Sequence, residues 1–211
     1  MATAMAIGQT LKGEAGIYSL KKQLQEGVWL ALNRKNENVV FKSARHFRIQ
    51  NERDVLLRCQ DRTSHLRRLL DEGVEDGLNP PRIVLKYLDD DLLRASRQQR
   101  LTPFEVKYVA KGVLSALAVL HADGFVHTGI AQSFIGRFLR WLIIFPDIKP
   151  SNVLVNYGSS DTRFAEVQLA DFGSTVHRES GHAVDGDEIG TSIFRSPEAQ
   201  LFMRWDISTD I

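Results

Sequence analysis

Three short apolar runs near the start of the chain most constrain its fold. Each is rich in residues that favour strands, and they are Ile17–Leu20, Val28–Leu32 and Asn38–Lys42. Gly27 separates the first two, and a polar turn that begins at Asn33 separates the last two. Short strands divided by such turns pair most simply with their neighbours, so the pattern predicts an antiparallel sheet.

Helical patterns follow this strand-rich region. Apolar residues recur at loosely helical spacing from His46 to Leu70, which predicts a helix over that range. A second helix is predicted from Pro103, because Thr102 can cap it and Glu105 lies three residues after the threonine. Between these helices, Arg82–Leu88 predicts another strand.

Two flanking segments have no strong pattern of their own. Residues 1–15 are small and polar, and we expect a flexible tail there. The acidic triplet Asp89–Asp91 follows the strand at 82–88, and we expect a solvated turn.

The composition is that of an ordinary folded protein. The 211 residues are 43% hydrophobic and 25% charged, which excludes a disordered chain, a collagen and a disulfide scaffold. The net charge of +1 gives no reason to expect nucleic acid or an anionic membrane as a partner. The single cysteine, Cys59, cannot form an internal disulfide, so an intracellular compartment, cytoplasmic or nuclear, is expected. The first residues do not resemble a signal peptide.

One polar cluster has the side chains that phosphoryl transfer needs. Asp147, Lys149 and Asn152 lie close together in a loop, because Pro150 discourages helix, and a strand follows at Val153. The carboxylate can accept a hydroxyl proton, the ammonium can steady a phosphate, and the amide oxygen can bind a metal.

A second cluster, Asp171-Phe172-Gly173, directly follows the strand-like run Val167–Ala170. A carboxylate at a strand end can coordinate Mg²⁺, which favours one or two carboxylates together with substrate phosphates. Residues 152–156 and 166–170 predict a hairpin that joins the two clusters. Either cluster alone would be compatible with simple turns, whereas the pair favours a functional site.

Together these motifs resemble those of eukaryotic protein kinases. Asp147, Lys149 and Asn152 match the catalytic loop D-x-K-P-x-N, and the segment from Asp171 matches D-F-G. The run Val39–Lys42 is similar to the V-A-I-K strand, with Glu52 as the expected partner of Lys42.

The resemblance extends along most of the chain. Leu85–Leu88 resembles the gatekeeper and hinge, and Ser196-Pro197-Glu198 resembles the A-P-E motif. Arg195 is similar to a residue of the CMGC branch, which includes the SR-protein kinases, and the chain also resembles short kinase-like proteins of fungi.

The resemblance implies an α+β, two-lobed fold, with a small antiparallel sheet lobe at residues 16–88 and an incomplete helical lobe at 89–211. It implies a Ser/Thr kinase that uses ATP and Mg²⁺, acts on a protein substrate and is a monomer.

The resemblance also implies a role for each site residue. Lys42, held by Glu52, would position the α- and β-phosphates, and Asp171 and Asn152 would hold Mg²⁺. Asp147 would orient and deprotonate the hydroxyl, and Lys149 would neutralise the γ-phosphate. The remaining nucleotide contacts implied are Gly27, Val28, Val40, Lys86, Leu88 and Leu154.

Three departures from the family pattern bear on activity. Of the glycine-rich loop only Gly27-Val28 remains, so few backbone amides can cover the phosphates. Thr128 stands where kinases have an arginine that pairs with a phosphorylated activation loop, which indicates activity that is not controlled in that way. Asp210 resembles the residue that holds the catalytic-loop backbone, but the helices expected after it are missing, so apolar surface should be exposed.

The fourth departure is an apolar segment, residues 129–146, between Thr128 and Asp147, which are adjacent in the family pattern. We interpret it as a retained in-frame intron or a gene-model error. The alternative is a genuine insertion that loops out at the surface near the cleft. With these departures, a catalytically impaired pseudokinase or a fragment that acts as a binding module stays open as the second function.

Overall fold

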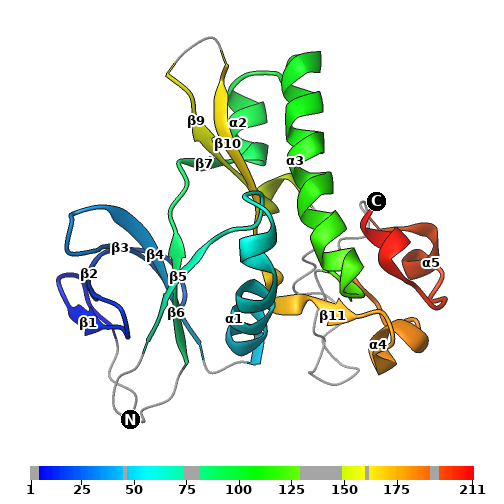
Figure 1. The fold of residues 1–211 in the computed structure, drawn as a ribbon, viewed down its shortest axis with the longest axis horizontal. Helices are drawn as coiled ribbons and strands as arrows, with labels where there is room; N and C mark the ends of the chain where they lie inside the picture. The colour runs from blue at the N-terminus through cyan, green and yellow to red at the C-terminus, as the bar shows by residue number, and fades with distance from the viewer. Residues whose placement is uncertain (1–4, 45–46, 74–80, 129–148, 160–161, 191–194) are drawn as a thin grey trace.

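The computed structural model describes residues 5–44, 47–73, 81–128, 149–159, 162–190 and 195–211 (Figure 1). The fold is α+β and kinase-like, with an antiparallel sheet in the N-terminal half and helices and short strand pairs in the remainder. The six strands of the sheet are arranged in the order β1-β2-β3-β4-β6-β5. Their bounds are Thr10–Lys12, Ile17–Gln25, Val28–Leu32, Asn38–Ser43, Arg82–Lys86 and Leu69–Glu72, in that spatial order.

The alternation of side chains along the strands gives the sheet two buried faces. On β4, Val39 and Phe41 belong to a cluster with Trp29 of β3, whereas Val40 belongs to the main core. Lys42 is two residues after Val40 and therefore shares its face of the sheet. Helix α1 (Phe47–Cys59) contributes to the main core, so Lys42 lies on the face of the sheet against which the helix packs.

The helical part is built around α3 (Pro103–Ala122), which begins with the predicted capping box. Thr102 accepts a bond from the Glu105 backbone, and the Glu105 carboxylate accepts one from the Thr102 backbone at 2.6 Å. Among the residues that the structure describes, no helix is both long and apolar enough to span a membrane.

The predicted hairpin is confirmed as β9 (Val153–Tyr157) and β10 (Phe164–Leu169), which extend beside α2 and α3 (Figure 1). A second short pair joins β8 (Phe125–Val126) to β11 (Val176–His177). The smaller elements are η1 (Gln60–Arg62), β7 (Asp90–Asp91), α2 (Leu92–Gln98), η2 (Pro150–Asn152), η3 (Phe172–Ser174), α4 (Gly181–Val184), α5 (Pro197–Gln200) and η4 (Ile207–Asp210).

The helix predicted from His46 to Leu70 is shorter than expected. Helix α1 ends at Cys59, and Leu69 already lies in strand β5, paired with Leu85 of β6. Leu66 forms a parallel bridge with Leu169. The spacing of the leucines fits a helix, but the free edges of two sheets offer them backbone partners, so tertiary pairing determines their conformation.

The expected tail at residues 1–15 is wrong for its last part. Thr10–Lys12 forms β1 and pairs with β2, and Leu11 is only 1% exposed. This strand adds an edge to the sheet and covers its second apolar cluster.

The expected solvated turn at Asp89–Asp91 is also more ordered than predicted. Asp90 and Asp91 form β7, which pairs with β9, and the Asp91 side chain caps α2 by accepting a bond from the Arg94 backbone. Short polar side chains satisfy free N–H groups at a helix start, which explains the acidic residue here.

Several apolar side chains near residue 200 are exposed. Leu201, Phe202 and Met203, which follow α5, are 66%, 62% and 55% exposed. Phe202 has a positive φ of 56°, an uncommon conformation for a bulky residue.

Candidate active site

The β9–β10 hairpin brings two predicted site residues together. Val153 pairs with Leu169 at its open end, so Asn152 and Asp171 extend from the same end of the two strands. The Ala170 backbone N–H donates to the Asn152 carbonyl at 2.9 Å. Lys149 begins the short turn that ends at Asn152, because the Asn152 N–H donates to its carbonyl at 2.8 Å.

The predicted ion pair between Lys42 and Glu52 is present. Lys42 Nζ lies 2.8 Å and 3.1 Å from the two carboxylate oxygens of Glu52. The Glu52 side chain is 2% exposed and lies among the buried residues of α1, where an unpaired carboxylate would be costly. The pair therefore fixes α1 against β4.

Helix α1 also holds the D-F-G segment, through a residue that the sequence reasoning missed. Asn51 Nδ2 lies 2.7 Å from the Thr175 carbonyl and within 3.2 Å of the Phe172 and Gly173 carbonyls. A Cβ at Gly173 would lie 3.0 Å from Arg48 Cβ, so glycine permits this close approach. The only sequence signal for Asn51 is its position next to Glu52.

Asp171 is held in a strained, charged state. Its backbone is left-handed, with φ 69° and ψ 62°, which is uncommon outside glycine and occurs most often at functional sites. Asp171 is an exposed residue, and although partial loss of hydration acts to raise the pKa of its carboxyl, the nearby Lys42, His127, Lys149 and Arg48 side chains, Lys42 most strongly, hold that pKa below its usual range. Asp171 is therefore an anion throughout the neutral pH range.

Buried hydrogen bonds support the segment that leads to Asp171. The backbone N–H of His127 donates to Asp210 Oδ2 at 2.8 Å, which confirms the expected role of Asp210. The ring Nε2 of His127 lies 3.0 Å from the Ala170 carbonyl. Because a carbonyl only accepts, Nε2 must bear the proton. Thr128 donates from Oγ1 to the Ser174 carbonyl at 2.8 Å, so it contacts the segment after Asp171 directly.

The arrangement fits a magnesium ion held by two oxygens. Asp171 supplies an anionic carboxylate, and Asn152, which is 6% exposed as a residue, supplies a side-chain amide oxygen. Mg²⁺ needs few protein ligands when substrate phosphates supply others. No group of three His, Cys, Asp or Glu side chains in the described part of the chain is arranged to bind a metal alone.

Gly27 forms a much tighter turn than a phosphate-covering loop. Gln25 pairs with Val28, so Glu26 and Gly27 alone connect β2 and β3. Gly27 has φ 70°, and a Cβ there would overlap the Ser43 carbonyl. The turn therefore requires glycine and leaves few free amides near Lys42.

The four predicted apolar contacts differ in burial. Val40 and Leu88 are 5% and 6% exposed, whereas Val28 and Leu154 are partly exposed. Lys86 is placed differently from a nucleotide-contacting side chain, because its Nζ binds Glu166 of β10 at 2.6 Å. Asp147 and the segment 129–146 lie outside the described residues.

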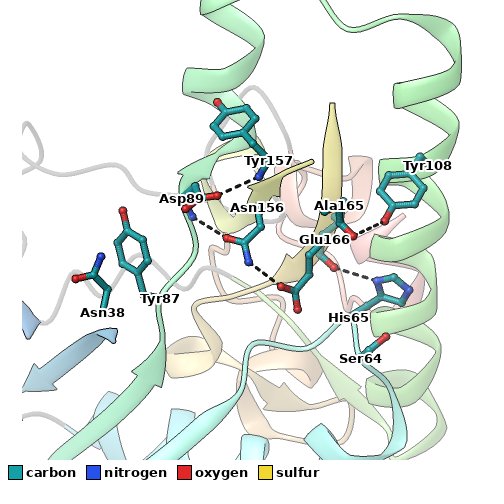
Figure 2. A pocket seen from close by; sticks show the side chains of 11 residues that line it. Asn38, Ser64, His65, Tyr87, Asp89, Tyr108, Asn156, Tyr157, Ala165 and Glu166 are labelled. Atoms are coloured by element: carbon teal, nitrogen blue, oxygen red, sulfur yellow. Dashed lines mark hydrogen bonds between the residues drawn. The ribbon is translucent and has the colours of Figure 1, made fainter. Parts of the chain in front are cut away.

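A separate pocket lies beside the hinge residues Tyr87 and Asp89 (Figure 2). Its volume is about 720 Å³, and Glu166 and Asn156 of the hairpin lie in its centre, 2.8 Å apart through a hydrogen bond. None of the predicted site residues lines it. It is therefore distinct from the site between β4, α1 and the hairpin.

Comparison with known proteins identifies relatives of one kind. CTD kinase subunit alpha of Schizosaccharomyces pombe is 30% identical over 168 residues, 78% of this chain and 24% of that protein. Mitogen-activated protein kinase spk1 of the same yeast is 28% identical over 125 residues, 58% of this chain and 27% of the relative. Extracellular signal-regulated kinase 1 of Candida albicans is 23% identical over 140 residues, 64% of this chain and 28% of the relative.

The chain is related to protein kinases. These relatives are CMGC-type kinases and support a protein kinase-like superfamily for the chain, in agreement with its fold. The matched part spans 24% to 28% of the length of these relatives. No protein-family model matches the chain.

Proposed function

We propose that this kinase-like chain binds ATP with Mg²⁺ and transfers the γ-phosphoryl group to a serine or threonine hydroxyl of a protein. The observation that supports the proposal is the Lys42–Glu52 ion pair, together with the hairpin that brings Asn152 and Asp171 to one end and the charge of Lys42 that acts on Asp171. The CMGC relatives and the motif from Arg195 favour a Ser/Thr kinase of the CMGC type, similar to SR-protein kinases.

In this proposal the basic residues would bind phosphate groups, and Asp171 and Asn152 would bind the metal ion. Lys42, held by Glu52, would bind and orient the α- and β-phosphates, while Lys149 would neutralise charge that develops on the transferred group. Asp171 and Asn152 would hold Mg²⁺, which neutralises phosphate charge when bound. Asp147 is assigned to orient the hydroxyl and accept its proton by its motif alone.

Control of activity is proposed to be independent of activation-loop phosphorylation. Thr128 is buried and already binds the Ser174 carbonyl, so the segment after Asp171 is held by a neutral hydroxyl in place of a cation–phosphate pair. A neutral donor gives a phosphate group no charge to pair with.

One observation favours a second function, binding without catalysis. The Glu26-Gly27 turn is too short to cover phosphates with several amides, which weakens nucleotide binding or leaves the γ-phosphate poorly held. On this second proposal the chain is a pseudokinase that acts as a binding module.

A binding experiment and an activity experiment separate the two proposals. Thermal-shift measurements with ATP and Mg²⁺ should show stabilisation that Asp171→Ala abolishes and Asp185→Ala, which removes an exposed carboxylate elsewhere, retains. Phosphate transfer to a basic protein is then measured with and without residues 129–146. Binding and transfer support the kinase, whereas a folded protein that shows no thermal shift supports the binding module.

A further inference from the structure

Arg67 is a buried charge that the proposed mechanism does not use. The residue is 7% exposed, whereas its neighbour Arg68 has a side chain that is 43% exposed and paired with Asp61 at 2.8 Å. A guanidinium remains protonated in proteins, and burying one is unfavourable unless nearby groups compensate its charge. A buried arginine beside a candidate site therefore needs an explanation.

The backbone and side chain of Arg67 connect two parts of the site. Its N–H donates to the Leu169 carbonyl at 2.9 Å, just before the segment that leads to Asp171. Its Nε donates to the Lys86 carbonyl, also at 2.9 Å, at the start of the hinge. Arg67 thus links the end of β10 to the hinge from inside the protein.

The charges around Arg67 are those of the site itself. Burial lowers the pKa of Arg67 to about 10, and the negative charges of Glu52 and Asp171 act in the opposite direction. Glu52 is already paired with Lys42. The charged groups near Arg67 are therefore the carboxylates of Glu52 and Asp171 and the ammonium group of Lys42. Arg67 is a buried residue, whereas Lys42 is only partly buried.

We propose that Arg67 is a positioning residue and a fixed counter-cation of the candidate site, which balances the negative charges of Glu52 and Asp171 from inside the protein. The charge it supplies would allow phosphate groups to lie near Asp171 with less help from a divalent cation, because a carboxylate and a phosphate otherwise repel each other. This inference rests on the proposed function, because it assumes that the candidate site binds a nucleotide.

The test compares two ligands of opposite charge. ATP binding is measured in EDTA, and binding of Mn²⁺ alone is measured by electron paramagnetic resonance. Arg67→Met should weaken metal-free ATP about tenfold and tighten Mn²⁺, because it removes one nearby positive charge. Arg67→Lys should stay close to the parent protein in both measurements, and Arg68→Met is the matched control for loss of a positive charge elsewhere.

The direction of the two changes distinguishes this role from a structural one. A packing defect would weaken both ligands, so equal losses of ATP and Mn²⁺ affinity in Arg67→Met would overturn the proposal. Affinities indistinguishable from those of Arg68→Met would also overturn it.

A ligand-independent measurement keeps the inference separate from the proposed function. If no variant binds ATP, the nucleotide proposal fails, and the coupling between Arg67 and Glu52 decides the role of Arg67. Arg67→Met should shift the urea midpoint less in a Glu52→Gln background than in the parent, because one of the anions it balances is gone. Equal shifts in the two backgrounds would refute charge balancing, and Arg67→Gln, which also removes the charge, supplies the same comparison if Arg67→Met does not fold.

Discussion

The Lys42–Glu52 pair gives the clearest quantitative prediction. Glu52→Gln keeps the size of the side chain but removes the charge that faces Lys42 Nζ at 2.8 Å and 3.1 Å. Breaking one side of a buried ion pair costs about 3–5 kcal/mol, because the remaining charge is left without compensation. Lys42 is 13% exposed and can reach some water, so we expect about 3 kcal/mol, at the lower end of that range.

Urea unfolding followed by circular dichroism measures this loss. With a slope of about 2–3 kcal/mol per molar urea for a chain of this size, the midpoint should fall by roughly 1–1.5 M. The double variant Lys42→Met, Glu52→Leu removes both charges, and its stability should lie within about 1 kcal/mol of the parent.

A surface pair supplies the control. Asp61→Asn breaks the ion pair between Asp61 and Arg68, whose side chains are 78% and 43% exposed respectively. It should therefore lower the free energy of unfolding by less than about 1 kcal/mol. If Glu52→Gln costs no more than Asp61→Asn, the buried pair does not fix α1 against the sheet and the reasoning is refuted.

Three further predictions concern the supporting structure. Tyr18→Phe removes the 2.8 Å bond to Asp71 and should cost about 1.5–3 kcal/mol at pH 7. Burial and this bond raise the pKa of Tyr18, so the hydroxyl contributes fully to stability below the unfolded pKa of about 10 and progressively less above it. Urea titrations of the parent and Tyr18→Phe that give the same stability difference at pH 8 and pH 11 would contradict this. Asp210→Ala leaves the His127 N–H without its acceptor and should cost about 1–3 kcal/mol, seen also as faster hydrogen exchange of that amide, with unchanged exchange as the opposing result. Leu11→Ala should lower the free energy of unfolding by about 2–4 kcal/mol in the same urea assay, and a change below about 0.5 kcal/mol would mean that β1 is not part of the core.

Local patterns in the sequence were sufficient for much of the fold. The strands, the capping box at Thr102 and the hairpin that carries Asn152 and Asp171 follow from apolar spacing and turn residues, and the structure confirms them. The Lys42–Glu52 pair was predicted from motif order, and the structure forms it. These features depend on residues that are close in sequence or on motifs in a recognisable order.

The tertiary structure decided the features that depend on distant partners. The leucines at 66–70 have a spacing that suits a helix or a strand, and pairing with β6 and with Leu169 selects the strand. The contacts of Asn51 with the D-F-G carbonyls span more than a hundred residues of chain, and no local pattern indicates them.

The same physical reason separates Arg67 from Arg68. In the sequence they are two adjacent arginines with no difference in local pattern. In the folded chain one donates to the hinge carbonyl and is buried, and the other pairs with Asp61 at the surface. The sequence determined that a positive charge would be present at each position, but burial depends on the packing of β5, β6 and β10, so only the tertiary structure decided which of the two arginines is buried.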